Sequence, residues 1–288
     1  MTALRLVRPP DLAPRRPRLA LPAGAIDCHC HTFGPPDRFP LIPDRLFDIG
    51  NHPIEQLVAL HDRLGLQRAV IVQSVLHGPS YAYMQDANAK YPGRFRYIAM
   101  PTAATSDADL AGMEACGAVG IRVAYRGSPH VDERLLAKLV ERGWHVQFWY
   151  RGAEEATNWL PIIRRTPGEH IIDHLGWPDP AEGIDGTAFR IALDLVTSGR
   201  AYVKLSGPGR YSREDRLPWR DVLPFIRKLA AEAPERLLWG SDWPHADLPG
   251  EMPNDGDLVD LIAEWLPDEK LRQLVLVENP ARKFGFPA

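Results

Sequence analysis

Short apolar segments alternate with helical segments along almost the whole of this 288-residue chain. Eight short apolar runs bounded by turn residues are predicted strands, at 26–32, 68–73, 95–100, 118–123, 145–149, 170–173, 201–205 and 237–239. The segments between and after them have helical character and predict helices at 54–64, 82–90, 108–116, 132–142, 153–165, 187–198, 219–233 and 257–265. Strands that alternate with helices form right-handed βαβ units, so these strands are expected to lie parallel in one sheet.

The number of these units selects the architecture. Eight βα units in a chain of this length predict an α/β fold with a single closed (β/α)8 TIM barrel, and a doubly wound open sheet is the alternative. No linker or shift of composition marks a second domain, so we assign residues 24–288 to the barrel and residues 1–23 to an extended N-terminal arm.

The N-terminal arm has a feature of export signals. Arg15-Arg16 followed by Leu19-Ala20-Leu21 resembles a twin-arginine signal, but the apolar part is short and is followed by Pro22. We expect instead that the arm lies on the surface of the barrel.

Composition and charge exclude several classes of protein. The chain is 45% hydrophobic and 25% charged, which is typical of globular domains. A net charge of -3 gives no field that would attract nucleic acid, and no apolar run approaches the ~18 residues that a membrane span needs. The three cysteines, Cys28, Cys30 and Cys116, lack metal-type spacing and predict reduced thiols in a cytoplasmic protein. We therefore expect a small-molecule partner rather than nucleic acid or a membrane, and leave a homo-oligomer open.

The first predicted strand carries the polar sequence Asp27-Cys28-His29-Cys30-His31. Side chains alternate between the faces of a strand, so Asp27, His29 and His31 are expected on one face and the two cysteines on the other. Two imidazoles at the end of a strand need a polar partner, a metal or a substrate, because an apolar core rejects them. The alternative is a pair of exposed loop histidines.

Further polar side chains follow or end the later strands, namely Ser74, Arg122, Tyr150, His174, Arg210 and Asp242. In a barrel these strand ends converge on one mouth, where the active site lies. A carboxylate such as Asp242 can take a proton from an attacking water, and imidazoles can polarise a carbonyl or hold a zinc ion. The set therefore predicts hydrolysis. Taken singly, Asp242 could be a helix cap and His174 a hydrogen-bonded core histidine.

Arginines after two of the strands indicate the charge of the substrate. Arg122, Arg126 and Arg210 carry guanidinium groups, which pair bidentately with carboxylates, so an anionic substrate is expected. For Arg126 and Arg213 a solvated basic surface is an equal alternative.

Five segments together resemble the amidohydrolase superfamily: Asp27-Cys28-His29-Cys30-His31, His174-Leu175-Gly176, Lys204-Leu205-Ser206-Gly207, Gly240-Ser241-Asp242-Trp243-Pro244-His245 and Glu278-Asn279-Pro280-Ala281. Within it, residues 24–286 are similar to the 2-pyrone-4,6-dicarboxylate lactonases and related sugar-lactone hydrolases. Metal-binding members usually place a histidine after strand five, and often a carboxylated lysine or a glutamate after strand four. This chain has Tyr150 and Arg122 at those places.

The resemblance implies a metal-independent lactone hydrolase of aromatic catabolism that needs no cofactor. It implies that Asp242 is the water-activating base and that three histidines orient and polarise the lactone carbonyl, namely His29, His31 and His174. It further implies five contacts to a dicarboxylate substrate, from Ser74, Arg122, Arg126, Tyr150 and Arg210.

Two alternatives remain. One is a zinc-dependent lactonase or a decarboxylase of aromatic-derived acids, with the metal held by His29, His31, His174 and Asp242. The other is a non-catalytic barrel that binds an organic acid.

Overall fold

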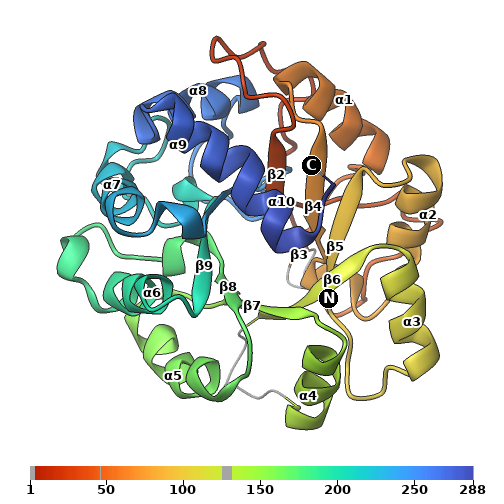
Figure 1. Cartoon of the computed structure of the whole chain (residues 1–288). Coiled ribbons are helices and arrows are strands. Elements are labelled where there is room, and N and C mark those ends of the chain that lie inside the picture. The colour runs from red at the N-terminus through yellow and green to blue at the C-terminus, as the bar shows by residue number, and fades with distance from the viewer. Residues whose placement is uncertain (1–3, 46, 125–131, 288) are drawn as a thin grey trace.

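The computed structural model describes residues 4–45, 47–124 and 132–287, and it confirms the predicted barrel. Eight parallel strands form one sheet in the order β10-β9-β8-β7-β6-β5-β4-β2 (Figure 1). The strands are β2 (Ile26–Cys30), β4 (Arg68–Val72), β5 (Phe95–Ala99), β6 (Ala118–Ala124), β7 (His145–Trp149), β8 (His170–Ile172), β9 (Ala201–Leu205) and β10 (Leu237–Trp239).

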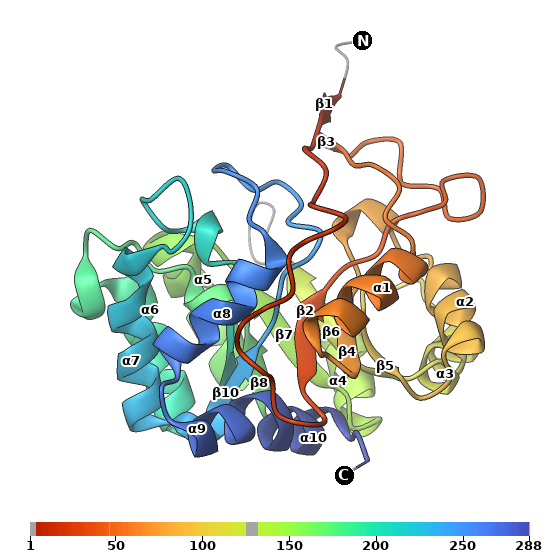
Figure 2. The ribbon, with the colours of Figure 1, turned by 90° about the horizontal axis from the view of Figure 1, so that it is seen from above.

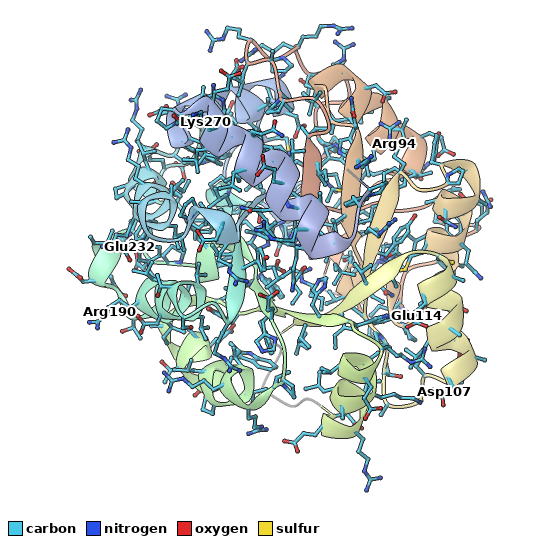
Figure 3. The ribbon with its side chains drawn as sticks, viewed as in Figure 1. Arg94, Asp107, Glu114, Arg190, Glu232 and Lys270 are labelled. Carbon is cyan, nitrogen blue, oxygen red and sulfur yellow. The ribbon has the colours of Figure 1, made fainter. Side chains whose placement is uncertain are left out.

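Helices surround this sheet (Figure 1). They are α1 (Ile54–Leu64), α2 (Ala82–Lys90), α3 (Asp107–Ala115), α4 (Glu133–Glu141), α5 (Gly152–Arg165), α6 (Thr187–Thr197), α7 (Leu223–Glu232), α8 (Asp255–Trp265), α9 (Glu269–Gln273) and α10 (Asn279–Phe284). Charged side chains on the outer helices face away from the barrel axis, as the labelled Asp107, Arg190, Glu232 and Lys270 show (Figure 3).

The predicted helix at 219–233 differs most from the structure. A 3₁₀ turn occupies Arg220–Val222, and α7 begins only at Leu223 with a proline in its first turn. Proline is tolerated there because the first helical N–H groups have no intrahelical acceptor. Helices α9 and α10 were not predicted.

The barrel closes between β2 and the segment after β10. The backbone N–H of Asp242 donates to the carbonyl of His29 at 2.7 Å, and that of His31 donates to Trp243 at 2.7 Å. Gly240 permits this approach, since a Cβ there would lie 2.6 Å from the Cβ of His29. The first and last strands thus bring the His-x-His motif against Asp242.

Helix α10 crosses the end of the barrel opposite the mouth (Figures 1 and 2). Apolar side chains fill this end. These inward-facing residues form one buried cluster of Ile26, Cys28, Val70, Val72, Ile98, Ile171, Tyr202, Leu238, Phe284 and Phe286. A larger cluster fills the space between the sheet and the helices. The polar residues above the inner cluster therefore sit on a packed floor and face the opposite end.

The described part of the N-terminal arm runs from the mouth side down along α8 before β2 enters the barrel (Figure 2). At its start, β1 (Arg5–Leu6) pairs with β3 (Phe47–Asp48). Further on, Arg15 forms ion pairs with Asp257 and Asp260 of α8. Within the described ranges, no helix is long and apolar enough to cross a membrane.

Candidate active site

A pocket opens at the carboxyl ends of the strands. Its empty volume, which includes open solvent at the mouth, is about 540 Å³. It is lined by His31, Phe33, Phe47, Ser74, Val75, Arg122, Trp149, Arg151, His174, Arg210, Asp242, Ala246 and Asp247. Six of the residues predicted from sequence are in this lining, each from a different strand end: His31, Ser74, Arg122, His174, Arg210 and Asp242.

The His-x-His strand does not alternate as predicted. Its pairing with β4 shifts between Asp27 and Cys30, so one extra residue is inserted in β2. Cys28 packs in the inner apolar cluster and Cys30 in the outer one, while Asp27 points out toward α1. The prediction that Asp27 shares a face with His29 and that the cysteines face together is therefore wrong.

Asp27 instead joins the two ends of the sheet. Its Oδ1 accepts hydrogen bonds at 3.0 Å from the backbone N–H groups of His29 and Ser241. Its Oδ2 accepts from the Ser241 hydroxyl at 2.6 Å and lies 3.2 Å from His61 Nε2. This buried carboxylate fixes the backbone on both sides of the His29–Asp242 contact.

Asp242 faces the two histidines of the motif. Its φ of 65° lies in the left-handed region, which aspartate tolerates better than most residues. Oδ1 lies 3.7 Å from Nε2 of His29 and 3.7 Å from Nε2 of His31, and has no hydrogen-bond partner among the residues described. Oδ2 accepts from Arg210 Nε at 2.5 Å. Burial would raise the pKa of Asp242, but Arg210 and then His174 outweigh it and hold that pKa well below its usual value.

His174 completes the imidazole cluster. Its ring centroid lies 4.7 Å from that of His29, and its Nδ1 lies 2.9 Å from the Ser206 hydroxyl. Its φ of 51° is unusual for a histidine and turns the chain into the mouth. Burial lowers the pKa of His174 to about 4, although Asp242 opposes the shift. The imidazole is therefore neutral near pH 7.

Guanidinium groups line the pocket. Arg122 is buried, its Nε lies 3.1 Å from Asp173 Oδ2, and its Cζ lies 4.9 Å from the centroid of the Trp149 ring. Arg151, which the sequence analysis did not single out, lies 5.0 Å from the centroids of Trp149 and Trp177. Together with Arg210 these groups make the pocket attractive to an anion.

Two other arginines lie elsewhere. Arg213 is largely exposed and pairs with Asp179 at 3.1 Å, which matches the alternative of a solvated surface. Arg126 lies outside the described residues.

Tyr150 is not part of the pocket, contrary to expectation. Val146, Phe148 and Tyr150 belong to the apolar cluster between the sheet and the helices. The residues between them, Gln147 and Trp149, point into the barrel. Side chains alternate along a strand, so a residue two positions after Phe148 faces the helices. Trp149 and Arg151 are the residues of this segment that line the pocket.

The amidohydrolase family model, Amidohydro_2, matches residues 26–286. The chain belongs to the amidohydrolase family. This amidohydrolase is similar to the 2-pyrone-4,6-dicarboxylate hydrolase of Comamonas testosteroni, with 35% identity over 286 residues that cover 94% of this chain and 93% of the relative. It is also similar to a 4-sulfomuconolactone hydrolase of Rhizobium radiobacter, with 37% identity over 276 residues that cover 92% of this chain and 91% of the relative.

A solved structure supports the same assignment. A proposed 2-pyrone-4,6-dicarboxylic acid hydrolase from Pseudomonas putida superimposes on this amidohydrolase with a TM-score of 0.79 and 28% identity, covering 93% of this chain and 100% of that one. The family resemblance found in the sequence is thereby confirmed.

Zinc is bound by many proteins through imidazole and carboxylate groups, and this amidohydrolase has such a set. One ligand atom each from His29, His31 and Asp242 lie within 4.8 Å of one another. His29 Nε2 and Asp242 Oδ1 are both buried without a hydrogen-bond partner in the described part of the chain. By its donor atoms alone, the set fits a divalent cation.

A buried polar layer beneath the pocket was missed. It consists of Gln147, Asp173 and Lys204, all of them buried and all in contact with one another. The alternation of side chains along β9 was a sign of this layer. Lys204 stands two residues after Tyr202, which faces inward, and so it also points into the barrel. Asp173 could have been noticed as the residue between β8 and His174.

Proposed function

We propose that this amidohydrolase opens a small carboxylated lactone by attack of water on the ring carbonyl. The observation that carries the proposal is the pocket-facing Asp242, whose Oδ1 is unpaired among the described residues and lies between two imidazoles under a group of guanidinium side chains. The names of the relatives, which specify a pyrone dicarboxylate and a sulfomuconolactone, support an anionic lactone as substrate.

In the proposed reaction Asp242 accepts a proton from water as the water oxygen attacks the carbonyl carbon. Its depressed pKa keeps it ionised at neutral pH. The imidazoles of His29, His31 and His174 orient the reactants, and N–H groups of this cluster that face the substrate stabilise the negative charge that develops on the carbonyl oxygen. The ring C–O bond then breaks, the proton from Asp242 passes to the departing ring oxygen, and a ring-opened carboxylate leaves.

We assign the binding of the substrate's acidic groups to the arginines that line the pocket. Arg122 and Arg210 bind carboxylates, Ser74 contributes a hydroxyl at the pocket wall, and Arg151 is positioned to take a second acidic group. Arg126 retains the carboxylate-binding role expected from the family resemblance.

We propose that the reaction needs no metal. Positive charge is already supplied by Arg122, Arg210 and Lys204, and the second oxygen of Asp242 is occupied by Arg210. The alternative is zinc held by His29, His31, His174 and Asp242, which would polarise the carbonyl as a Lewis acid. Of these four residues, His29, His31 and Asp242 offer ligand atoms within 4.8 Å of one another. We further place this activity in the cytoplasm, in aromatic catabolism, and the free buried thiols of Cys28, Cys30 and Cys116 support a reducing compartment.

A panel of lactones that share a ring but carry none, one or two carboxylates tests the proposal. Ring opening is followed by acid release and by the change in ring absorbance, with the Asp242→Asn variant as control. We expect turnover to increase with the number of carboxylates. Tight binding without turnover would instead support an organic-acid-binding barrel, and release of carbon dioxide would support a decarboxylase.

A further inference from the structure

Lys204 lies inside the barrel between the apolar floor and the pocket, and its side chain is completely buried. An ammonium group has three N–H donors. Three acceptors surround Lys204 Nζ: Gln147 Oε1 at 2.6 Å, His29 Nδ1 at 3.3 Å and Asp173 Oδ1 at 3.5 Å. Gln147 and His29 accept hydrogen bonds from the ammonium, and Asp173 Oδ1 is an ion-pair partner without an aligned hydrogen bond among the described residues.

The neighbours of Lys204 are arranged to favour its charged form. Gln147 directs its carbonyl oxygen to the lysine and donates from Nε2 to Asp173 Oδ2 at 2.9 Å. The reversed amide would set an NH₂ group against the ammonium and an oxygen against the carboxylate. Asp173 is an adjacent anion, and its Oδ1 lies 3.5 Å from Lys204 Nζ. A buried carboxylate of this kind stabilises the ammonium form of its partner.

We propose that Lys204 fixes His29 in the tautomer that carries its proton on Nε2. A proton on Nδ1 would face an N–H of the ammonium at 3.3 Å, and the lysine would lose one of its acceptors. Asp173 Oδ1 also lies 3.3 Å from Nδ1, yet it has no aligned hydrogen bond within the described residues. The lone pair of Nδ1 is therefore directed to Lys204.

The other histidine of the motif has the opposite arrangement. His31 Nδ1 lies 2.6 Å from the carbonyl oxygen of Val72, which can only accept, so Nδ1 carries the proton. In the neutral ring, Nε2 of His31 is then an acceptor. The two Nε2 atoms that face Asp242 consequently differ, with a donor on His29 and an acceptor on His31.

The donor on His29 and the acceptor on His31 would have separate roles in hydrolysis. This catalytic part of the inference rests on the proposed function. His29 Nε2–H faces Asp242 Oδ1, 3.7 Å away, and can hold this carboxylate in place for the attacking water. Water can donate one hydrogen to Asp242 Oδ1 and the other to His31 Nε2. Lys204 is thus a positioning residue that acts through His29.

The same tautomer opposes a metal ion. A metal needs the lone pair of Nε2, and second-shell partners of a ligating histidine normally accept a proton from its other nitrogen. Lys204 donates where such a partner would accept. The positive charge of the ammonium adds to the opposition.

Side-chain nitrogen NMR of the protein labelled with 15N-histidine tests the tautomer without substrate. The His29 signal is assigned by comparison with a His29→Gln variant. We expect Nε2–H in the wild type, Nε2–H in Lys204→Arg, and Nδ1–H in Lys204→Met, where Asp173 becomes the acceptor. Nδ1–H in the wild type, or an unchanged tautomer in a folded Lys204→Met protein, would overturn the inference. The wild-type measurement decides even if the variants do not fold.

Zinc titration gives a second readout. We expect Lys204→Met to bind zinc about 10–100-fold more tightly than the wild type, the usual size of an outer-shell effect. Lys283→Met is the matched control, because Lys283 has a side chain only 8% exposed and pairs with Glu169 away from the pocket. Equal zinc affinity in wild type and Lys204→Met would contradict the inference. Neither readout uses a lactone, so their failure is distinguishable from failure of the proposed hydrolysis.

Discussion

Arg210 and Asp242 form a buried ion pair in which Nε of the guanidinium lies 2.5 Å from Oδ2 of the carboxylate. The pair leaves Oδ1 directed at the imidazoles, where no described residue hydrogen-bonds to it. Arg210 therefore orients the proposed base and also lowers its proton affinity. The two roles can be separated experimentally.

Arg210→Met should move the acid limb of the kcat/KM profile to higher pH. Asp242 must be ionised to act as a base, and in the absence of Arg210 burial raises its pKa with less opposition. The measurement is the pH dependence with a neutral lactone, which avoids effects on substrate carboxylates. Arg122→Met is the control and should leave the limb nearly in place, because Arg122 pairs with Asp173.

Asp242→Asn should lower turnover by about 10²–10⁴ with the fold retained, since general-base catalysis has this typical magnitude. Asparagine tolerates the left-handed backbone that this position requires. Turnover by Asp242→Asn within about threefold of wild type would remove Asp242 from the mechanism.

Loss of a substrate-binding arginine should be selective for charged lactones. Arg122→Met and Arg210→Met should each remove a contact of about 1.5–3 kcal/mol, or roughly 10–100-fold in kcat/KM. Lysine should restore little, because it lacks the planar fork. The ratio of kcat/KM for a carboxylated and a neutral lactone of the same ring is the measurement. An unchanged ratio in both variants would make these arginines structural.

Activity should survive dialysis against a strong chelator, with metal content well below one ion per chain. The physical reason is the positive charge of Arg122, Arg210 and Lys204 around the donor set. Elemental analysis and assays before and after dialysis measure this. Inactivation that zinc reverses would establish the zinc-dependent alternative.

Buried histidines should make the fold less stable in acid. His77 stacks between Phe33 and Tyr83, and burial, with a smaller effect of His31, lowers its pKa to about 3. In the unfolded chain His77 has its ordinary pKa of 6.5. Between about pH 3 and pH 6.5 the unfolded chain therefore binds more protons at this residue than the folded protein does. The free energy of unfolding should therefore fall as pH falls below about 6.5, by up to about 1.4 kcal/mol per pH unit for this residue.

His77→Phe should reduce that slope by the same amount. Chemical denaturation at several pH values between about 5 and 7 is the measurement. His174, whose pKa is also lowered by burial, should leave part of the slope in the variant. Identical slopes in the two proteins would show that His77 does not couple folding to protons.

Local patterns were enough for the architecture. Alternating apolar and helical segments predicted all eight barrel strands within one or two residues at their ends, because strand and helix periods are properties of contiguous sequence. The barrel then implied a common mouth, and His31, His174 and Asp242 do meet there. Family membership followed from motifs that are themselves contiguous.

The directions of side chains depended on tertiary structure. An inserted residue in β2 reversed the face of Asp27 relative to His29, since a bulge changes the alternation of every residue after it. Tyr150 faced the helices because it stands an even number of residues from Phe148, an orientation that only packing identifies. The contact of Lys204 with His29 joins residues 175 positions apart. Such a pair forms when the ends of a sheet approach each other, and local sequence carries no information about which buried donor will meet which acceptor.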